Sequence, residues 1–207
     1  MRSKARVTLA TIAMPAVVTV MLGGLMGSLS AQQTPAAPAA PARVPPLIMT
    51  STAWEDGGVI PEKFTQAVPN AVSPELKWTQ VPPGTQSFVL LMHDPEPVLN
   101  KGSKMDITHW LVWNIPGTST GLPEGVATGE LPDGTRQVSL RSNGYMGPGA
   151  PAGPYHHYTF ELYALDTKLD IALPTPQQAA DTRNAVVNAM DGHVLGKAVL
   201  VARFHRQ

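Results

Sequence analysis

An apolar segment near the middle of the chain reads Ser87-Phe88-Val89-Leu90-Leu91-Met92 (residues 87–92). A short segment of this kind, rich in β-forming side chains and without an alternating polar face, is typical of a strand covered on both sides. A second segment, Trp110-Leu111-Val112-Trp113-Asn114-Ile115, has the same character and ends at Pro116-Gly117. The two segments therefore predict two central strands, each buried on both faces.

Further strands are expected on either side of this pair. They are predicted for Leu47–Ser51, Ser73–Trp78, Tyr158–Leu165 and Ala198–Phe204. The segments Asn100–Asp106 and Gly117–Asn143 are rich in turn residues, and they join strands that we interpret as too central for simple hairpins. The sequence thus predicts a mainly β, largely antiparallel fold with Greek-key-like crossovers and one or two short packed helices.

One helix is predicted between the last two strands. Thr175 is its expected N-cap, Pro176 fits the first turn, Gln178 completes a capping box, and Gly192 ends it. The residues expected to form its apolar stripe are Ala179, Val186, Val187 and Met190.

Composition excludes several classes of site. The 207 residues include no cysteine, which removes disulfides, thiolate nucleophiles, iron–sulfur clusters, Cys-ligated zinc and a cysteine-borne lipid anchor. The 15 basic and 15 acidic side chains balance, whereas nucleic-acid-binding proteins carry a basic surplus. Nucleic acid is therefore not an expected partner.

The N-terminal region has the layout of an export signal. Basic residues precede an apolar run from Val7 to Met26, and small residues follow, so residues 1–31 predict a signal peptide, with an uncleaved membrane anchor as the alternative. Residues 32–46 predict a Pro/Ala-rich linker and residues 47–207 the folded domain. Removal of the leader leaves 12 basic against 15 acidic side chains, a net charge of −3. The expected location is periplasmic or secreted.

Histidines gather at predicted strand ends beside turns, where sites are usually built. His93 precedes the loop Asp94-Pro95-Glu96-Pro97, and His109 opens the strand that begins Trp110. His156 and His157 open a third strand, after a loop rich in Gly and Pro. The turn Arg141-Ser142-Asn143 before that loop could contact an anion, but we interpret it as a solvated turn.

Three segments resemble motifs of the phosphatidylethanolamine-binding protein family, in its bacterial Raf-kinase-inhibitor-like branch. They are Asp94-Pro95-Glu96-Pro97, the strand from His109-Trp110 to Ile115-Pro116, and the Gly/Pro-rich loop and strand from Gly147 to Asp166. Together with smaller similarities elsewhere in the chain, these segments extend from Leu47 to Phe204 and occur in the same order as the motifs of the family. Two departures are that His157 stands where the family has Arg, and that the acidic loop is one residue shorter.

The resemblance implies a β-sandwich with a small anion-binding pocket. It assigns ligand binding to Asp94, His109, Gly147, His156 and Tyr158, and a supporting role to Glu96, Pro97 and His157. It implies an exported module that binds phosphate, phosphoethanolamine or a phospholipid head group without turnover, with no catalytic residue, cofactor or metal.

Imidazoles and a phenol can donate hydrogen bonds to phosphate oxygens, whereas Asp94 would repel a bare phosphate. The mixture of signs favours a zwitterion over a simple anion. The histidines are expected to gain charge between pH 8 and pH 6 and so to strengthen phosphate binding.

Two other functions remain open. The first is a metal-assisted hydrolase that uses Asp94, His109, His156 and His157, although no His-Glu-x-x-His spacing is present. The second is a protease- or kinase-inhibiting surface of the kind that the family name suggests.

Overall fold

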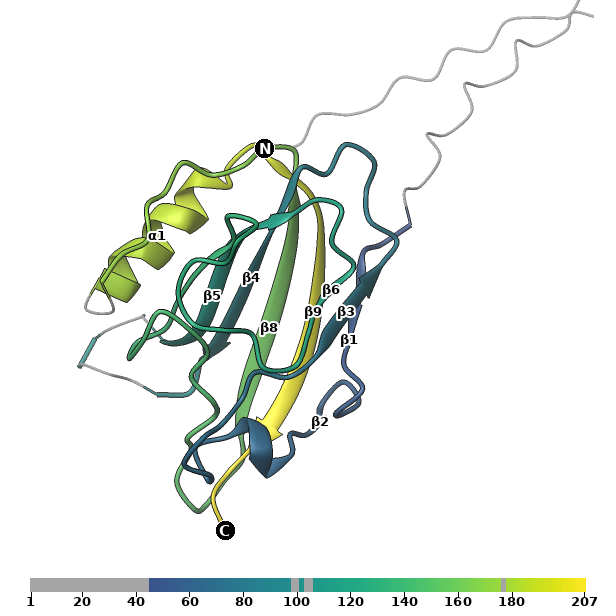
Figure 1. The fold of residues 1–207 in the computed structure, drawn as a ribbon. Helices are drawn as coiled ribbons and strands as arrows, with labels where there is room; N and C mark the ends of the chain where they lie inside the picture. Colours follow the sequence, from purple (N-terminus) through teal and green to yellow (C-terminus); the bar gives the residue numbers. More distant parts are fainter. Residues whose placement is uncertain (1–44, 98–100, 103–105, 176–177) are drawn as a thin grey trace, which may run out of the picture. The chain divides into compact units, whose positions relative to one another are not determined.

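The computed structural model describes residues 45–97, 101–102, 106–175 and 178–207 (Figure 1). The predicted signal peptide and nearly all of the predicted linker lie outside these residues. In chain order the elements are β1 (Ile48–Thr50), β2 (Gly58–Val59), the 3₁₀ helix η1 (Glu62–Phe64), β3 (Leu76–Thr79), β4 (Ser87–Asp94), β5 (Ile107–Pro116), β6 (Gly121–Leu122), β7 (Arg136–Val138), β8 (His156–Leu165), α1 (Ala179–Ala189) and β9 (Val194–Phe204).

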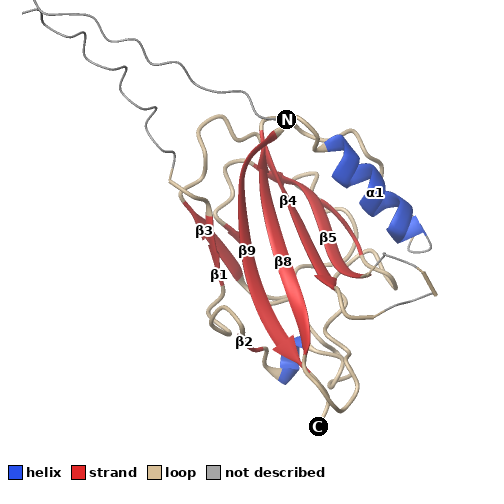
Figure 2. Cartoon of the chain, turned by 180° about the vertical axis from the view of Figure 1, so that it is seen from behind, coloured by secondary structure: helices blue, strands red, loops and turns tan. Residues whose placement is uncertain are grey.

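The strands form two sheets. The larger has the order β2-β9-β8-β4-β5-β7 and the smaller the order β1-β3-β6, and every pairing is antiparallel except that of β2 with β9. The small sheet covers one face of the large sheet, and α1 lies on the opposite face (Figures 1 and 2). The prediction of a mainly β fold with a packed helix is confirmed.

Burial on both faces explains the apolar run in β4. Phe88, Leu90 and Met92 pack in the core between the two sheets, whereas Val89 and Leu91 pack in a second core beneath α1. None of the five side chains is more than 4% exposed. Each contributes about 1.5–3 kcal/mol through burial of apolar surface, so the large sheet is held from both sides.

The two long connections for which crossovers were expected, between β4 and β5 and over residues 117–143, differ in topology. β4 and β5 are direct antiparallel neighbours, so the chain between them closes a wide hairpin, and the expectation that this connection is not a hairpin is wrong. The segment 117–143 does cross over: it adds β6 to the small sheet and then β7 to the free side of β5. β8 pairs with the other side of β4.

The helix α1 differs in detail from its prediction. Its N-cap is Gln178 rather than Thr175. The backbone N–H and the hydroxyl of Thr175 donate hydrogen bonds to Gln178 Oε1, at 3.1 and 3.2 Å. Pro176 lies outside the described residues. Val187 is 39% exposed and does not belong to the buried stripe, whereas the other predicted stripe residues are buried.

Gly192 follows α1 with a φ of +80°, the left-handed conformation that glycine adopts at helix ends. No helix in the described part of the chain is long and apolar enough to span a bilayer.

A charged cluster attaches α1 to the sheet. The guanidinium of Arg183 donates to the carboxylate of Asp106, and His93 Nδ1 lies 2.5 Å from the other oxygen of that carboxylate. The Arg183 and Asp106 side chains are each 16% exposed. Burial opposes ionisation of Asp106, but the hydrogen bonds from His93 and Arg183 outweigh it and hold the Asp106 pKa well below its usual value.

Arg183→Gln is expected to lower the free energy of unfolding by about 3 kcal/mol, because it leaves a largely buried carboxylate without its cation. A depressed Asp pKa contributes stability above its unfolded value, and that stability is lost as pH falls through the folded value. The difference between wild type and variant should therefore shrink below about pH 4. Urea denaturation at neutral and acidic pH measures both effects.

The control is Lys63→Gln, which removes the exposed pair between Lys63 and Glu124 (2.9 Å) and should change stability by less than about 1 kcal/mol. An equal loss in the two variants would mean that the Arg183–Asp106 pair does not anchor the helix.

Candidate ligand-binding site

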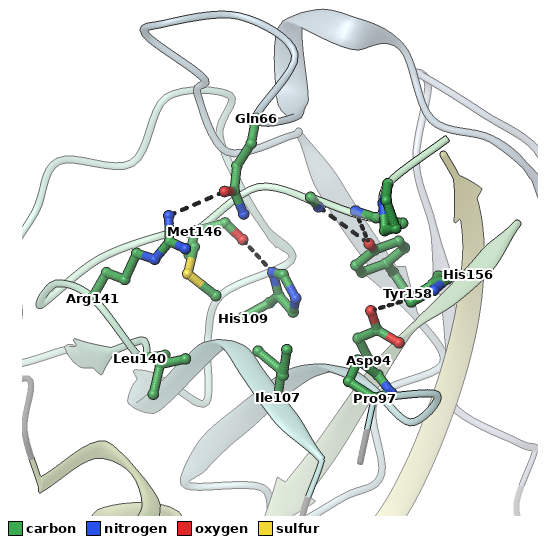
Figure 3. Close-up of a pocket in the computed structure, with 13 residues that line it drawn as sticks. Gln66, Asp94, Pro97, Ile107, His109, Leu140, Arg141, Met146, His156 and Tyr158 are labelled. Carbon is green, nitrogen blue, oxygen red and sulfur yellow. Dashed lines mark hydrogen bonds and ion pairs between the residues drawn. The ribbon is translucent and has the colours of Figure 1, made fainter. Parts of the chain in front are cut away.

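A cavity of about 180 Å³ lies at the end of the large sheet where β4 ends and β8 begins (Figure 3). Strand ends and three loops contribute its walls. The lining residues are Gln66, Asp94, Pro97, Ile107, His109, Leu140, Arg141, Met146, Gly149, Ala150, Pro151, His156 and Tyr158.

A β-bulge turns His109 into the cavity. Met92 is paired with Trp110 and His93 with Thr108, so His109 is an extra residue in β5. Thr108 faces α1, with its hydroxyl 3.4 Å from an Arg183 nitrogen, whereas Trp110 packs between the sheets. Because the bulge interrupts the alternation, His109 shares the face of Trp110.

Burial and one hydrogen bond determine the protonation state and the tautomer of His109. Its side chain is 2% exposed, and Nδ1 lies 2.8 Å from the carbonyl oxygen of Met146, which can only accept. Nδ1 therefore carries the hydrogen, and Nε2 of the neutral ring is an acceptor. Burial lowers the His109 pKa to about 4. The expectation that His109 gains charge between pH 8 and pH 6 is wrong.

Asp94 forms the acidic end of the cavity. It is 2% exposed, its Oδ2 lies 2.8 Å from His156 Nδ1, and its Oδ1 accepts the backbone N–H of Glu96 at 3.1 Å. Burial raises the Asp94 pKa above its usual value. The side chain follows the face of Met92 at the end of β4, which is why it lies on the cavity side of the sheet.

Tyr158 connects the sheet to the Gly/Pro-rich loop. Its ring packs edge-on against His109 with 5.1 Å between centroids. Its hydroxyl oxygen accepts the N–H groups of Gly149 (3.1 Å) and Ala150 (3.0 Å). Burial, followed by the charge of Asp94, raises the Tyr158 pKa to about 12, so the phenol keeps its proton and can donate it.

The structure brings most of the predicted ligand-binding residues together. The cavity is lined by Asp94, His109, His156 and Tyr158, and by Pro97 from the predicted supporting set. Gly147 does not line it. A Cβ on Gly147 would lie 2.5 Å from the Phe64 carbonyl oxygen, so this glycine is needed for close packing, and Gly149 and Ala150 provide the loop's wall instead.

The remaining predicted supporting residues lie beside the cavity. Glu96 and His157 pair with each other, with His157 Nδ1 2.7 Å from Glu96 Oε1 and the His157 backbone N–H donating to the same carboxylate. Neither is among the lining residues, and His157 is exposed.

Gln66 is a polar lining residue that no sequence motif indicates, whereas Arg141 was a candidate for contact with an anion that the sequence favoured less than a solvated turn. Arg141 lies in an exposed turn, as interpreted, and its side chain also lines the cavity, where it is placed for the alternative of contact with an anion. Arg141 Nη1 donates to Gln66 Oε1 at 3.2 Å. The available signal was the position of Arg141 just before the Gly/Pro-rich loop.

Three ligand atoms suited to a metal ion lie near one another at the acidic end. Within the described residues, Asp94, Glu96 and His156 offer atoms that are all within 4.8 Å of each other. His109 and His157, which the hydrolase alternative requires, are not in this group. Each of its members already has a hydrogen-bond partner, Asp94 with His156 and Glu96 with His157.

His109→Gln is expected to remove a pH-dependent loss of stability. An unfolded histidine, with a pKa of about 6.5, binds a proton between pH 6.5 and pH 4, whereas folded His109 does not. Stability rises with pH wherever the unfolded state binds more protons, so wild type should lose about 2 kcal/mol from this group between pH 7 and pH 5. Denaturant titration at the two pH values measures the loss.

The exposed His193 provides the control, since His193→Gln should keep the full wild-type loss. If His109→Gln kept it too, burial of a neutral His109 would not be the cause.

Comparison with known proteins agrees with the fold and with the sequence motifs. The family model described as phosphatidylethanolamine-binding protein matches residues 50–205. A UPF0098 protein of Methanothermobacter thermautotrophicus is 42% identical over 157 residues, which are 74% of this chain and 95% of that protein. Escherichia coli YbhB, also a UPF0098 protein, is 38% identical over 99 residues, 46% of this chain and 60% of YbhB.

Two crystal structures share the architecture. A phosphatidylethanolamine-binding protein homolog of Chlamydia trachomatis matches with a TM-score of 0.66 and 27% identity over 78% of this chain and 99% of its own. Escherichia coli YbcL is described as a member of the mammalian phosphatidylethanolamine-binding protein family. It matches with a TM-score of 0.63 and 25% identity over 78% of this chain and 99% of YbcL. This chain belongs to the phosphatidylethanolamine-binding protein family.

Proposed function

We propose that this protein is an exported binding protein for small zwitterionic ligands that carry a phosphate and an ammonium group, such as phosphoethanolamine, and that it does not turn them over. The observation that carries the proposal is one cavity with opposite charges at its two ends. Asp94 and His156 lie at one end and Arg141 at the other, with His109 and Met146 between them (Figure 3).

The charges of the lining residues suit a zwitterion better than a bare anion. The carboxylate of Asp94 would repel a phosphate but attracts an ammonium group. Neutral His109 presents an acceptor at Nε2, which also suits an N–H donor. Arg141 is the fixed positive charge among the described lining residues, and a guanidinium binds phosphate oxygens well.

The size of the cavity favours a small head group. Its volume of about 180 Å³ lies below the range of about 300–1,000 Å³ typical of pockets for drug-sized ligands. A ligand of a few heavy atoms fills it, and a larger ligand must extend beyond it.

The protonation and hydrogen bonding of the Tyr158 hydroxyl support binding without turnover. Tyr158 has the one hydroxyl among the described lining residues, and a pKa of about 12 keeps it a poor nucleophile. Its oxygen is also occupied by two backbone N–H groups. The basic and apolar leader in residues 1–31 supports export to the periplasm or beyond. The name of the matching family supports a head group of the phosphoethanolamine class.

Isothermal titration calorimetry with phosphoethanolamine tests the proposal. Wild-type protein should bind phosphoethanolamine more tightly than it binds inorganic phosphate or ethylammonium, because only the zwitterion satisfies both ends of the cavity. Asp94→Asn should weaken phosphoethanolamine binding by about tenfold or more, since hydrogen bonds to charged groups are worth about 1.5–3 kcal/mol.

Asp170→Asn is the matched control, because Asp170 is exposed and follows the far end of β8; its affinity should equal that of wild type. The proposal is wrong if wild-type protein binds none of the three compounds, or if inorganic phosphate binds as tightly as phosphoethanolamine. Release of inorganic phosphate from phosphoethanolamine, with or without added zinc, would contradict binding without turnover.

A further inference from the structure

We propose that Asp94, Glu96 and His156 form a binding site for a divalent transition-metal ion of the zinc class at the acidic end of the cavity. This site goes beyond the proposed function, because it takes an inorganic ion rather than an organic ligand. It also differs from the metal-free pocket that the family resemblance implies. A metal ion and an ammonium group would both use Asp94, so they exclude each other at this end of the cavity.

The antiparallel pairing of β4 with β8 brings the three side chains together. Asp94 is the last residue of β4, Glu96 follows it by two residues, and His156 is the first residue of β8. Each side chain offers one ligand atom, and the three atoms lie within 4.8 Å of one another. The ligand atoms of a tetrahedral zinc ion are about 3.3 Å apart, given bonds of about 2.0–2.1 Å. Small side-chain movements are therefore enough to close the site.

The kinds of ligand atom select the class of metal ion. One imidazole nitrogen and two carboxylate oxygens form a set that suits zinc and its neighbours among the transition metals. Magnesium and calcium bind oxygen ligands in preference to nitrogen, so the imidazole disfavours them. Three protein ligands leave a coordination position of the zinc ion open to water.

The two carboxylates lack a fixed positive charge. In the described part of the chain, neither Asp94 nor Glu96 forms an ion pair with a lysine or an arginine, and their partners are His156 and His157. The Asp94 side chain is only 3% exposed, which distinguishes it from an ordinary surface acid. Burial raises the pKa of Asp94, and the hydrogen bond with the Glu96 carboxyl raises it further. A divalent ion can take the place of the proton that two such carboxyls compete for.

Hydrogen bonds from the backbone already orient the two carboxylates. The Glu96 N–H donates to Asp94 Oδ1 at 3.1 Å, and the His157 N–H donates to both oxygens of Glu96 at 3.1 and 3.2 Å. His157 Nδ1 also lies 2.7 Å from Glu96 Oε1. Partners of this kind orient metal ligands and change metal affinity by about 10–100-fold. His157 is therefore a positioning residue of the site and not a ligand.

Two other histidine–carboxylate pairs among the described residues lie outside this site, and neither has a third ligand. His193 Nδ1 lies 2.7 Å from Asp166 Oδ1, but no ligand atom of another described residue completes a group with them. The third member of the cluster that contains His93 and Asp106 is the Arg183 guanidinium, which repels a cation. The third ligand thus separates the proposed site from an ordinary histidine–carboxylate pair.

Calorimetric titration of the full-length protein, carrying no histidine tag, with zinc chloride tests the proposal. Wild type should bind one zinc ion at this site. His156→Gln and Glu96→Gln should each weaken zinc binding by about 100-fold or more, because each removes a ligand, and His157→Gln should weaken it by about tenfold. His193→Gln is the matched control: it removes an imidazole from a pair without a third ligand and should leave the affinity unchanged.

Cobalt(II) provides a second readout, because it accepts the same ligands as zinc and absorbs visible light when they bind it. Wild type and His193→Gln should show the absorption bands of a protein-bound cobalt ion, and His156→Gln should lose them. Circular dichroism of each variant establishes that it is folded.

The proposal is wrong if wild type binds no zinc, if His193→Gln weakens zinc binding as much as His156→Gln does, or if magnesium binds as tightly as zinc. The titrations contain no phosphoethanolamine, so each of these results leaves the proposed function standing. A protein that binds zinc through His156 but does not bind phosphoethanolamine would keep the metal site and lose the proposed function.

Discussion

The β-bulge at His109 is the constraint on which the cavity depends. Because β5 is buried on both faces, a regular β5 would send His109 and Trp110 to opposite cores. The extra residue lets Trp110 stay between the sheets while His109 joins Tyr158 on the same side. The bulge thus places the His109 imidazole in the cavity at the end of the sheet while Trp110 stays packed in the core.

The buried strands were predictable and the short ones were not. The uninterrupted apolar character of β4 and β5 reflects two separate cores, and that constraint is visible in the sequence itself. β2 and β6 are two residues long and exist only because longer strands lie beside them, so they leave no periodic signal. The direct pairing of β4 with β5 was missed because a long connection says little about which strands are neighbours.

The residues of the candidate site likewise include some that were predictable from the sequence and some that were not. Asp94, His109, His156 and Tyr158 lie at strand ends next to turns, and motif resemblance identified them. Arg141 and Gln66 are 75 residues apart in the chain, and their contact arises only when two surface loops meet. The neutral state of His109 was also missed, because its low pKa comes from burial that a sequence does not reveal.

The resulting cavity is polarised along its length, from the buried carboxylate of Asp94, past neutral His109, to Arg141 at its other end. The central claim, that both ends of the cavity hold one zwitterion, is tested most directly by a crystal structure of the protein with phosphoethanolamine. The ammonium group is predicted at Asp94 and the phosphate on the Arg141 guanidinium. A phosphate seated against Asp94 with the ammonium group directed to solvent would contradict the claim.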